Sequence, residues 1–338
     1  MKHLMFVMAH YLLFAFSLSG AAPDSTSAVL ALQRILPAEY ILPAPRSITW
    51  TNDSITVQLF AREFNQGNIV YLEIIPKEKD TTNKELITCT YEHTGVFLKS
   101  FRWGYRGFFA LPPDSSAGEK KLVLEYQHSS QPVRYVIPFS VGETNFPVYR
   151  RSMNVGKFSD IHHASDPEIQ TFIMNCAEKK KEVFSLQSED LLTSVLAHPR
   201  DKHHITSQFW STRIYERYKI KNGRKVAQPS ETKFHRGVDF RGTGGDPVYA
   251  LADGRVVLAE KMYYEGNFTV IDHGNRIFSY YMHQSTILVK GGQFVKGGDK
   301  IGTVGSTGVS TGPHLHVSLV VNGIQVDPLS ILPLPIRN

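Results

Sequence analysis

Cysteine is scarce in this sequence, since 338 residues contain only Cys89 and Cys176. Two cysteines in separate segments exclude a small fold held by a dense disulfide framework, and neither lies beside histidines in a zinc-finger spacing. A disulfide between them stays open, although Cys176 falls on the apolar face of an expected helix, where a buried free thiol is ordinary. Length and a hydrophobic content of 42% instead predict two domains with their own cores.

Several motifs are also missing. The chain has no His-Glu-x-x-His, which excludes the helix-based zinc proteases as a template, and no Gly-x-x-x-x-Gly-Lys-Ser/Thr phosphate loop. It has no helix-turn-helix, zinc-finger or ribonucleoprotein signature, so nucleic acid is not an expected partner. Beyond the N-terminal segment, no stretch is long and apolar enough to span a membrane.

The N-terminus has the pattern of an export signal. Lys2 supplies a positive charge, the stretch from Leu4 to Leu18 is mostly apolar, and small residues follow at Ser19 to Ala22. As a helix the apolar stretch would be ~22 Å long, short of the ~30 Å hydrocarbon core. We expect residues 1–22 to be a cleaved signal peptide, with no stable membrane span afterwards. The mature protein is then expected in the periplasm or cell envelope, or secreted.

Charge is distributed unevenly along the chain. The net charge is +6, and residues 201–338 carry all of this excess, with 17 Lys+Arg against 11 Asp+Glu. Such a basic patch favours an anionic polymer, for which cell-wall carboxylates are suitable; a solvated face without a partner is the alternative. The densest part lies within 213–241 and comprises Arg213, Arg217, Lys219, Lys221, Arg224, Lys225, Lys233, Arg236 and Arg241.

Short strand-like segments separated by turns predict an antiparallel β-sandwich over residues 47–142. A connector follows at 143–200, where Ser165-Asp-Pro-Glu168 has the signals of a helix start and a second short helix could occupy 188–197. From 201 to 338 the pattern is β-rich again. The expected strands are 54–60, 69–75, 107–111, 121–126, 133–137, 248–250, 254–260, 269–272, 277–281, 300–304 and 316–321.

Two histidine motifs in the C-terminal region indicate a metal site. His314 and His316 are two residues apart, so a strand would place both side chains on one face. His235 and Asp239 are four apart, but the glycine and β-branched residues around them favour a loop that leads into a strand. Imidazole and carboxylate are ligands that zinc accepts, and three protein ligands with an open position are typical of catalytic zinc. Four candidates leave one histidine for work as a base or an electrophile.

The motifs around these residues resemble those of the lysostaphin/LytM-type zinc endopeptidases, which cleave peptide bonds in bacterial peptidoglycan. The resemblance covers roughly residues 201–333. It rests on His235-Arg-Gly-Val-Asp239-Phe, Pro247-Val-Tyr-Ala250 with Asp253-Gly254, Tyr281-Met-His283, and Gly305-Ser-Thr-Gly-Val-Ser-Thr-Gly-Pro-His314-Leu-His316. One departure is Phe209-Trp210-Ser-Thr-Arg213, where the family often has Phe-Gly-x-Arg, which leaves the local loop path open but does not affect the expected metal site. The order of segments before 143 similarly resembles an immunoglobulin-like module found ahead of some of these domains.

The resemblance implies a mainly β metallopeptidase domain at 201–338 that binds one zinc ion through His235, Asp239 and His316. It also implies that His283 and His314 are the two catalytic residues that do not bind zinc. The expected activity is zinc-dependent hydrolysis of peptidoglycan peptides. The alternative is a non-catalytic wall-binding or amidase-activating relative, but such relatives lose metal ligands that are intact here. Neither the scissile bond nor the oligomeric state follows from the sequence.

Overall fold

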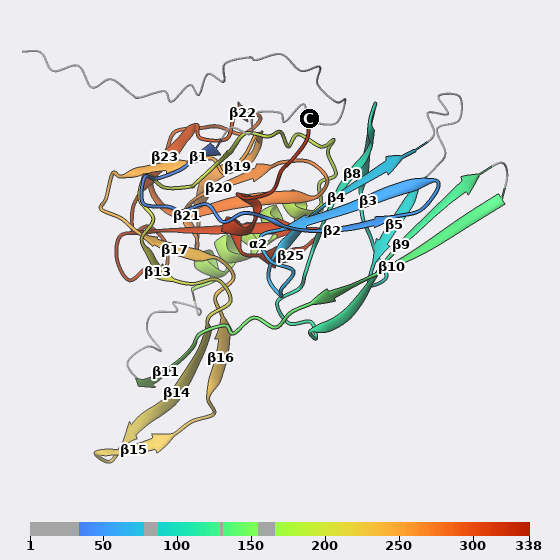
Figure 1. Cartoon of the computed structure of the whole chain (residues 1–338). Coiled ribbons are helices and arrows are strands. Elements are labelled where there is room, and N and C mark those ends of the chain that lie inside the picture. Colours follow the sequence, from blue (N-terminus) through green and yellow to red (C-terminus); the bar gives the residue numbers. More distant parts are fainter. Residues whose placement is uncertain (1–33, 78–86, 129–130, 155–165) are drawn as a thin grey trace, which may run out of the picture. The chain divides into compact units, whose positions relative to one another are not determined.

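The computed structural model describes residues 34–77, 87–128, 131–154 and 166–338 (Figure 1). The predicted signal peptide at 1–22 lies outside these residues. Most of the described chain is β-strand, and apart from two parallel pairs the strands pair antiparallel, which confirms the expected mainly β fold. Within the described ranges, no helix is both long and apolar enough to cross a membrane.

Two sheets pack against each other over residues 46–141. One has the strand order β2-β3-β4-β8-β7 and the other β10-β9-β5-β6. Val57 and Leu72 of the first sheet share a buried core with Leu122 and Leu124 of the second. The strands expected here are confirmed, whereas an immunoglobulin-like arrangement stays a prediction. The bounds are β2 (Arg46–Thr51), β3 (Ile55–Ala61), β4 (Ile69–Pro76), β5 (Thr88–Tyr91), β6 (Thr94–Gly95), β7 (Leu98–Phe101), β8 (Gly104–Ala110), β9 (Gly118–His128) and β10 (Gln131–Val141).

A sheet of ten described strands forms the framework of the C-terminal region. Its main path is β13-β17-β24-β21-β20-β19-β22, and β18, β23 and β25 pair at its sides. All strands expected between 248 and 321 are present, and β23 begins and ends where the sequence predicts. The bounds are β13 (Ile205–Ser207), β17 (Val238–Arg241), β18 (Pro247–Tyr249), β19 (Gly254–Met262), β20 (Gly266–Asp272), β21 (Ile277–Ile287), β22 (Phe294–Val295), β23 (Lys300–Val304), β24 (His314–Val321) and β25 (Ile324–Val326), followed by the 3-10 helix η1 (Pro328–Ile331).

A further small sheet extends away from the ten-stranded sheet and is called the arm below (Figure 1). It consists of β11 (Val148–Asn154), β14 (Thr212–Lys221), β15 (Arg224–Ala227) and β16 (Glu231–Phe234). β14 pairs in parallel with β11 and antiparallel with β15 and β16. Asn222 and Gly223, with φ of 49° and 73°, close the β14–β15 hairpin, as expected for an Asn-Gly turn whose two residues both have positive φ. None of these four strands was among the expected ones.

Helix α2 (Pro167–Ser185) is the helix expected in the connector. Its N-cap is Asp166, whose carboxylate accepts from the backbone N–H of Glu168, one residue later than Ser165. The helix buries Cys176 and Val183 in a cluster with residues of β19, β20 and β21. Cys176 is therefore a buried free thiol, as expected, and Cys89 is also free and buried.

The second short helix expected at 188–197 is wrong. This segment instead lies against the ten-stranded sheet and forms no helix. It ends in β12 (Leu196–Ala197), which pairs in parallel with β1 (Arg34–Ile35). The backbone N–H of Leu191 donates to the backbone carbonyl of His273, and that of Ala197 donates to the backbone carbonyl of Leu251. These backbone groups find partners in the sheet and its loops, so a local helix would leave the sheet's carbonyls unpaired.

The N-terminal sheets and the C-terminal region share one core. Side chains of β4 alternate, so that Val70 and Leu72 face the sandwich core while Ile69 and Tyr71 join the core of the ten-stranded sheet. Arg106 of β8 is buried at the same boundary, where it donates to the Asp190 carboxylate at 2.7 Å and to two backbone carbonyls. Residues before 142 and residues after 200 therefore pack against each other, and the module boundaries at these positions stay a prediction.

Candidate metal centre and active site

Two neighbouring strands and one loop bring His235, Asp239 and His316 together. Asp239 lies in β17 directly opposite His316 in β24. His235 lies in the short loop between β16 and β17, which confirms the expected loop that leads into a strand. Its backbone N–H donates to the carbonyl of Ser211 and its carbonyl accepts from Trp210, so the loop is held at both sides of the residue.

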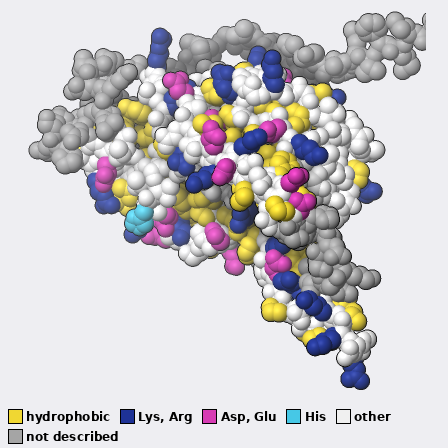
Figure 2. Space-filling view, turned by 180° about the vertical axis from the view of Figure 1, so that it is seen from behind, with side chains coloured by type: hydrophobic (Ala, Val, Ile, Leu, Met, Phe, Trp, Pro, Cys, Tyr) yellow, Lys and Arg dark blue, Asp and Glu magenta, His cyan; other side chains and the backbone are white. Residues whose placement is uncertain are grey.

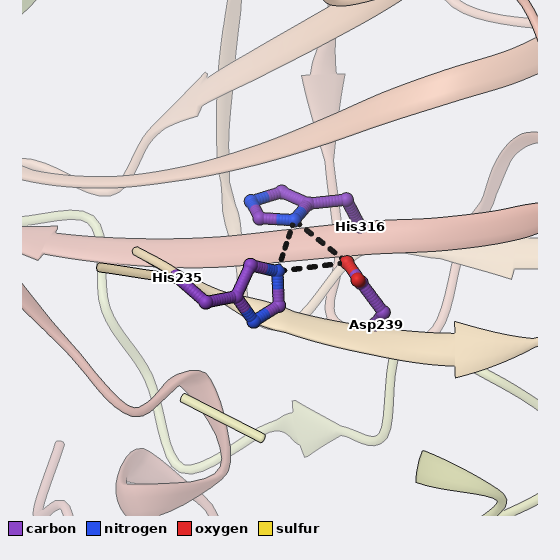
Figure 3. Close-up of side chains that lie close together, drawn as sticks. All are labelled: His235, Asp239 and His316. Carbon is purple, nitrogen blue, oxygen red and sulfur yellow. Dashed lines mark hydrogen bonds and ion pairs between the residues drawn. The ribbon is translucent and has the colours of Figure 1, made fainter. Parts of the chain in front are cut away.

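Three side-chain atoms converge on one point (Figure 3). His235 Nε2 lies 3.0 Å from Asp239 Oδ1 and 3.1 Å from His316 Nδ1. His316 Nδ1 lies 2.8 Å from the same carboxylate oxygen. Among the described residues this is the His, Cys, Asp and Glu cluster whose geometry could hold a metal ion. Two imidazole nitrogens and one carboxylate oxygen form a donor set that zinc accepts.

The hydrogen bonds behind the cluster fix the tautomers of both histidines. His235 Nδ1 lies 2.9 Å from the carbonyl of Gln208 and must donate to it. Ser318 Oγ donates to the carbonyl of Arg236, so it accepts from His316 Nε2 at 3.0 Å. Each ring therefore carries its proton on the far nitrogen and presents a lone pair to the cluster, as metal-ligating histidines do. Two lone pairs 3.1 Å apart repel each other unless a cation lies between them, so the residues fit a metal ion.

The electrostatics of the cluster suit the same assignment. Burial alone would raise the pKa of Asp239, but its close contacts with the His235 and His316 rings hold it well below its usual range. Burial also lowers the pKa of His316, which keeps its ring neutral at pH 7. Arg213 of β14 lies 3.6 Å from Asp239 Oδ2 and donates to Ser207 Oγ, which contacts His235 Nδ1.

His283 and His314 lie beside the cluster. His314 Nε2 is 3.8 Å from Asp239 Oδ1, and its Nδ1 donates to the carbonyl of Gly312. His283 Nδ1 donates to the carbonyl of Thr307 at 2.9 Å. Burial lowers the pKa of His283 to about 4, so its ring is neutral at pH 7. Both rings therefore direct Nε2 away from their backbone acceptors and can take up a proton there.

Tyr281 and His283 lie two residues apart but do not share a face, unlike alternate residues of a regular strand. Tyr281 packs in the core, where its hydroxyl accepts from the N–H of Leu251. His283 has a φ of 62°, and the β20–β21 register shifts here. A left-handed residue in a bulged strand re-aims the side chain. His283 thus lies next to His314, with ring centroids 4.8 Å apart.

The loop that departs from the family pattern has a defined conformation. Trp210 has a φ of 55°, in the left-handed region that glycine adopts most readily. The Trp210 ring stacks on Phe234 with 5.0 Å between the ring centroids. The backbone N–H of Trp210 donates to the backbone carbonyl of His235. The tryptophan therefore takes a glycine-like backbone conformation at this position and leaves the metal site intact.

Three residues support the site although the sequence motifs do not point to them in this role. Ser318 and Ser207 bond to the far nitrogens of the two candidate histidine ligands, and Arg213 faces Asp239. Ser318 was two residues beyond His316 in an expected strand, so the alternation of side chains could have placed it on the same face. No local pattern predicts that Ser207 and Arg213 approach His235.

Comparison with known proteins matches the C-terminal region. Residues 233–328 match the protein-family model described as Peptidase family M23. The chain is 48% identical over 95 residues to the peptidoglycan DD-endopeptidase ShyA of Vibrio cholerae, which covers 28% of this chain and 22% of ShyA. It is 42% identical over 104 residues to the DD-carboxypeptidase/endopeptidase Mpg of Neisseria meningitidis, 30% of this chain and 24% of Mpg.

A solved structure is similar over much more of the chain. A crystal structure of a Pseudomonas aeruginosa protein assigned to peptidase M23 aligns with a TM-score of 0.53 at 22% identity. The alignment covers 81% of this chain and 96% of that one, so the likeness in fold extends beyond the matched region. ShyA and Mpg, in contrast, match this chain over less than a quarter of their own lengths. The family model and the similarity to these relatives over the same region lead to one conclusion: residues 233–328 form a domain of peptidase family M23.

Proposed function

We propose that this protein is a zinc-dependent endopeptidase that hydrolyses peptide bonds in bacterial peptidoglycan. The observation that carries the proposal is the convergence of His235, Asp239 and His316, with two further histidines beside them. The relatives support the substrate, because ShyA and Mpg are named for endopeptidase activity and ShyA for peptidoglycan. The scissile bond to test first is the D,D-bond in their names.

His235, Asp239 and His316 would hold one zinc ion. When bound, zinc lowers the pKa of a coordinated water and polarises a carbonyl group, and one ligand carboxylate leaves the centre with a net positive charge. Gln208 and Ser318 keep the proton of each histidine ligand on the far nitrogen. Both rings would therefore present a lone pair to the ion.

His283 and His314 would carry the proton transfers. A peptide-bond hydrolysis needs a base that accepts the proton of the attacking water and an acid that protonates the leaving amine. His283 is neutral at pH 7 because burial lowers its pKa, and its Nδ1 proton is held by the Thr307 carbonyl. The Gly312 carbonyl orients His314 in the same way. Nε2 is thus the atom of each ring that takes up or releases a proton.

We further propose that the protein acts outside the cytoplasm. The export pattern at 1–22 and the extracytoplasmic location of peptidoglycan support this. A cytoplasmic enzyme would not meet its substrate. Fractionation of cells that express the full chain, with the N-terminus of the mature protein sequenced, tests this part alone.

A digestion of purified sacculi tests the activity. The zinc-loaded protein should convert cross-linked muropeptide dimers to monomers, as followed by liquid chromatography with mass spectrometry. Chelation should stop the reaction and one equivalent of zinc should restore it. If the folded, zinc-loaded protein leaves all cross-links intact, the protein is a non-catalytic relative and the proposal is wrong.

A further inference from the structure

The arm has two chemically different faces. Side chains alternate along a strand, and residues paired across a sheet lie on the same face. The register of β14 with its three partners therefore assigns each arm residue to one face. One face carries a single acidic residue, Glu231, and seven basic ones, namely Arg151, Arg213, Arg217, Lys219, Lys221, Arg224 and Lys233. We call this the cationic face.

The opposite face of the arm has a different composition. It presents mostly apolar or uncharged groups, among them Ile220 and Phe234, with Arg150 and Lys225 as its basic residues. The Lys225 ammonium lies over the Tyr218 ring, 4.7 Å from its centroid, as expected for two residues on the same face. The excess of positive charge that the sequence shows between 213 and 241 is thus concentrated by the fold on one side.

The cationic face is open to solvent and extends from the tip of the arm to the metal site. Lys219, Lys221 and Arg224 are exposed at the tip, and Lys and Arg side chains are visible along the arm as far as its end (Figure 2). At the root, Arg213 lies 3.6 Å from Asp239 Oδ2. Lys221 lies eight positions after Arg213 in the same strand, about 27 Å away at the usual rise.

We propose that the cationic face binds the carboxylate-bearing peptide strands of peptidoglycan and directs them to the metal site. This inference rests on the proposed function. Basic residues two apart on one face lie about 7 Å from each other, so an extended anionic polymer can meet several of them at once. An anionic polymer that lies along this face reaches the candidate metal centre beside Asp239. This position favours the substrate itself as the ligand over an anionic lipid or a nucleic acid.

Two triple variants of the full chain separate the cationic face from total charge. The tip variant is Lys219→Gln, Lys221→Gln and Arg224→Gln. The matched control is Lys290→Gln, Lys296→Gln and Lys300→Gln, which removes three exposed lysines outside the arm. Zinc content and thermal unfolding check that both variants fold. Co-sedimentation with purified sacculi at 50 and 300 mM salt then measures binding.

We expect the tip variant to bind sacculi about tenfold more weakly than the wild type at low salt, with a higher KM for intact sacculi. Its binding should depend less on salt, because fewer exposed charges remain to be screened. The control should bind like the wild type. Conversion of the sacculus carboxylates to amides should reduce wild-type binding to the level of the tip variant, while removal of phosphate-bearing polymers from the wall should not.

Other outcomes contradict the proposal. Equal binding by the tip variant and the control would overturn it, as would binding that survives carboxylate amidation. A tip variant that loses only its binding to phosphatidylglycerol vesicles or to DNA would assign the arm to a different partner. If the wild type neither binds nor cleaves sacculi, the proposed function itself is wrong. That result is distinct from equal cleavage by the wild type and the tip variant, which contradicts only the role of the cationic face.

Discussion

His283 and His314 lie side by side, with ring centroids 4.8 Å apart and ring planes tilted by 49°. Each ring has its Nδ1 proton fixed by a backbone carbonyl, from Thr307 in one case and from Gly312 in the other. This shared arrangement leaves two Nε2 atoms at one side of the candidate zinc ligands. A site of this kind separates the residues that hold a metal from those that move protons, and the two groups can be tested separately.

The hydroxyl of Ser318 should contribute to metal affinity. It accepts from His316 Nε2 and donates to the carbonyl of Arg236, so Ser318→Ala releases the ring from its fixed tautomer. We expect zinc affinity to fall roughly 10- to 100-fold, as measured by competition with a chromophoric chelator.

Ser279→Ala is the matched control for the serine experiment. Ser279 is as fully buried as Ser318, but its hydroxyl contacts His273 and Tyr281 instead of a candidate ligand. The control should lose stability and keep its zinc affinity. Similar affinity losses in both variants would show that general softening of the sheet, not the ligand tautomer, determines metal binding.

The buried pair Arg106–Asp190 should be important for stability. The Arg106 side chain is 2% exposed and that of Asp190 is 0% exposed, so Arg106→Leu leaves a buried carboxylate without its cation. Removal of one partner of such a pair typically costs about 3–5 kcal/mol. Denaturant unfolding measures the change.

An exposed ion pair provides the comparison. Arg134 and Glu125 form a pair whose side chains are 61% and 58% exposed, and Arg134→Leu should change stability by less than about 1 kcal/mol. A small effect of Arg106→Leu, equal to that of the exposed pair, would mean that water reaches Asp190 and that the interface between the sheets is loose.

His198 should make the metal-free protein acid-sensitive. Burial, with the charges of His203 and Arg200, lowers its pKa to about 4, although a backbone bond and Glu39 oppose this. An unfolded histidine titrates near ~6.5, so between these values the unfolded state binds more protons. Stability therefore falls as pH decreases from ~6.5 to about 4, by up to ~1.4 kcal/mol per pH unit for this group.

The free energy of unfolding between pH 7.5 and 4 tests the contribution of His198. His198→Phe should reduce the steepness of the decline, whatever its effect on stability at pH 7.5. The exposed His204 supplies the control, because His204→Phe should leave the steepness unchanged. An unaltered slope in His198→Phe would mean that His198 is already protonated in the folded state.

Local patterns were sufficient for much of this fold. Lys300–Val304 has the bounds that its composition predicts, because both ends are marked by turn residues. His314 and His316 both face Asp239, because alternation along a strand depends on nothing beyond the strand. The Asn222-Gly223 pair is a local signal of the same kind, because an Asn-Gly turn predicts a hairpin such as β14–β15.

Long-range contacts set the rest. The pairing of β11 with β14 joins residues about 60 positions apart, and no local pattern specifies that partner. The second expected helix fails because residues near Leu191 bond to His273 instead of to one another. The positive φ of His283 depends on the register shift between β20 and β21. Such features are decided by tertiary packing, which overrides local propensity.

We expect His235, Asp239 and His316 to hold the metal while His283 and His314 transfer protons. Zinc content and turnover, measured together in His316→Ala and His314→Ala, test it most directly. His316→Ala should lose both, and Ala at His235 or Asp239 should do the same. His314→Ala should keep most of its zinc while turnover falls roughly 10²–10⁴-fold, as should His283→Ala. If His314→Ala empties the site while His316→Ala stays zinc-loaded and active, the assignment is contradicted.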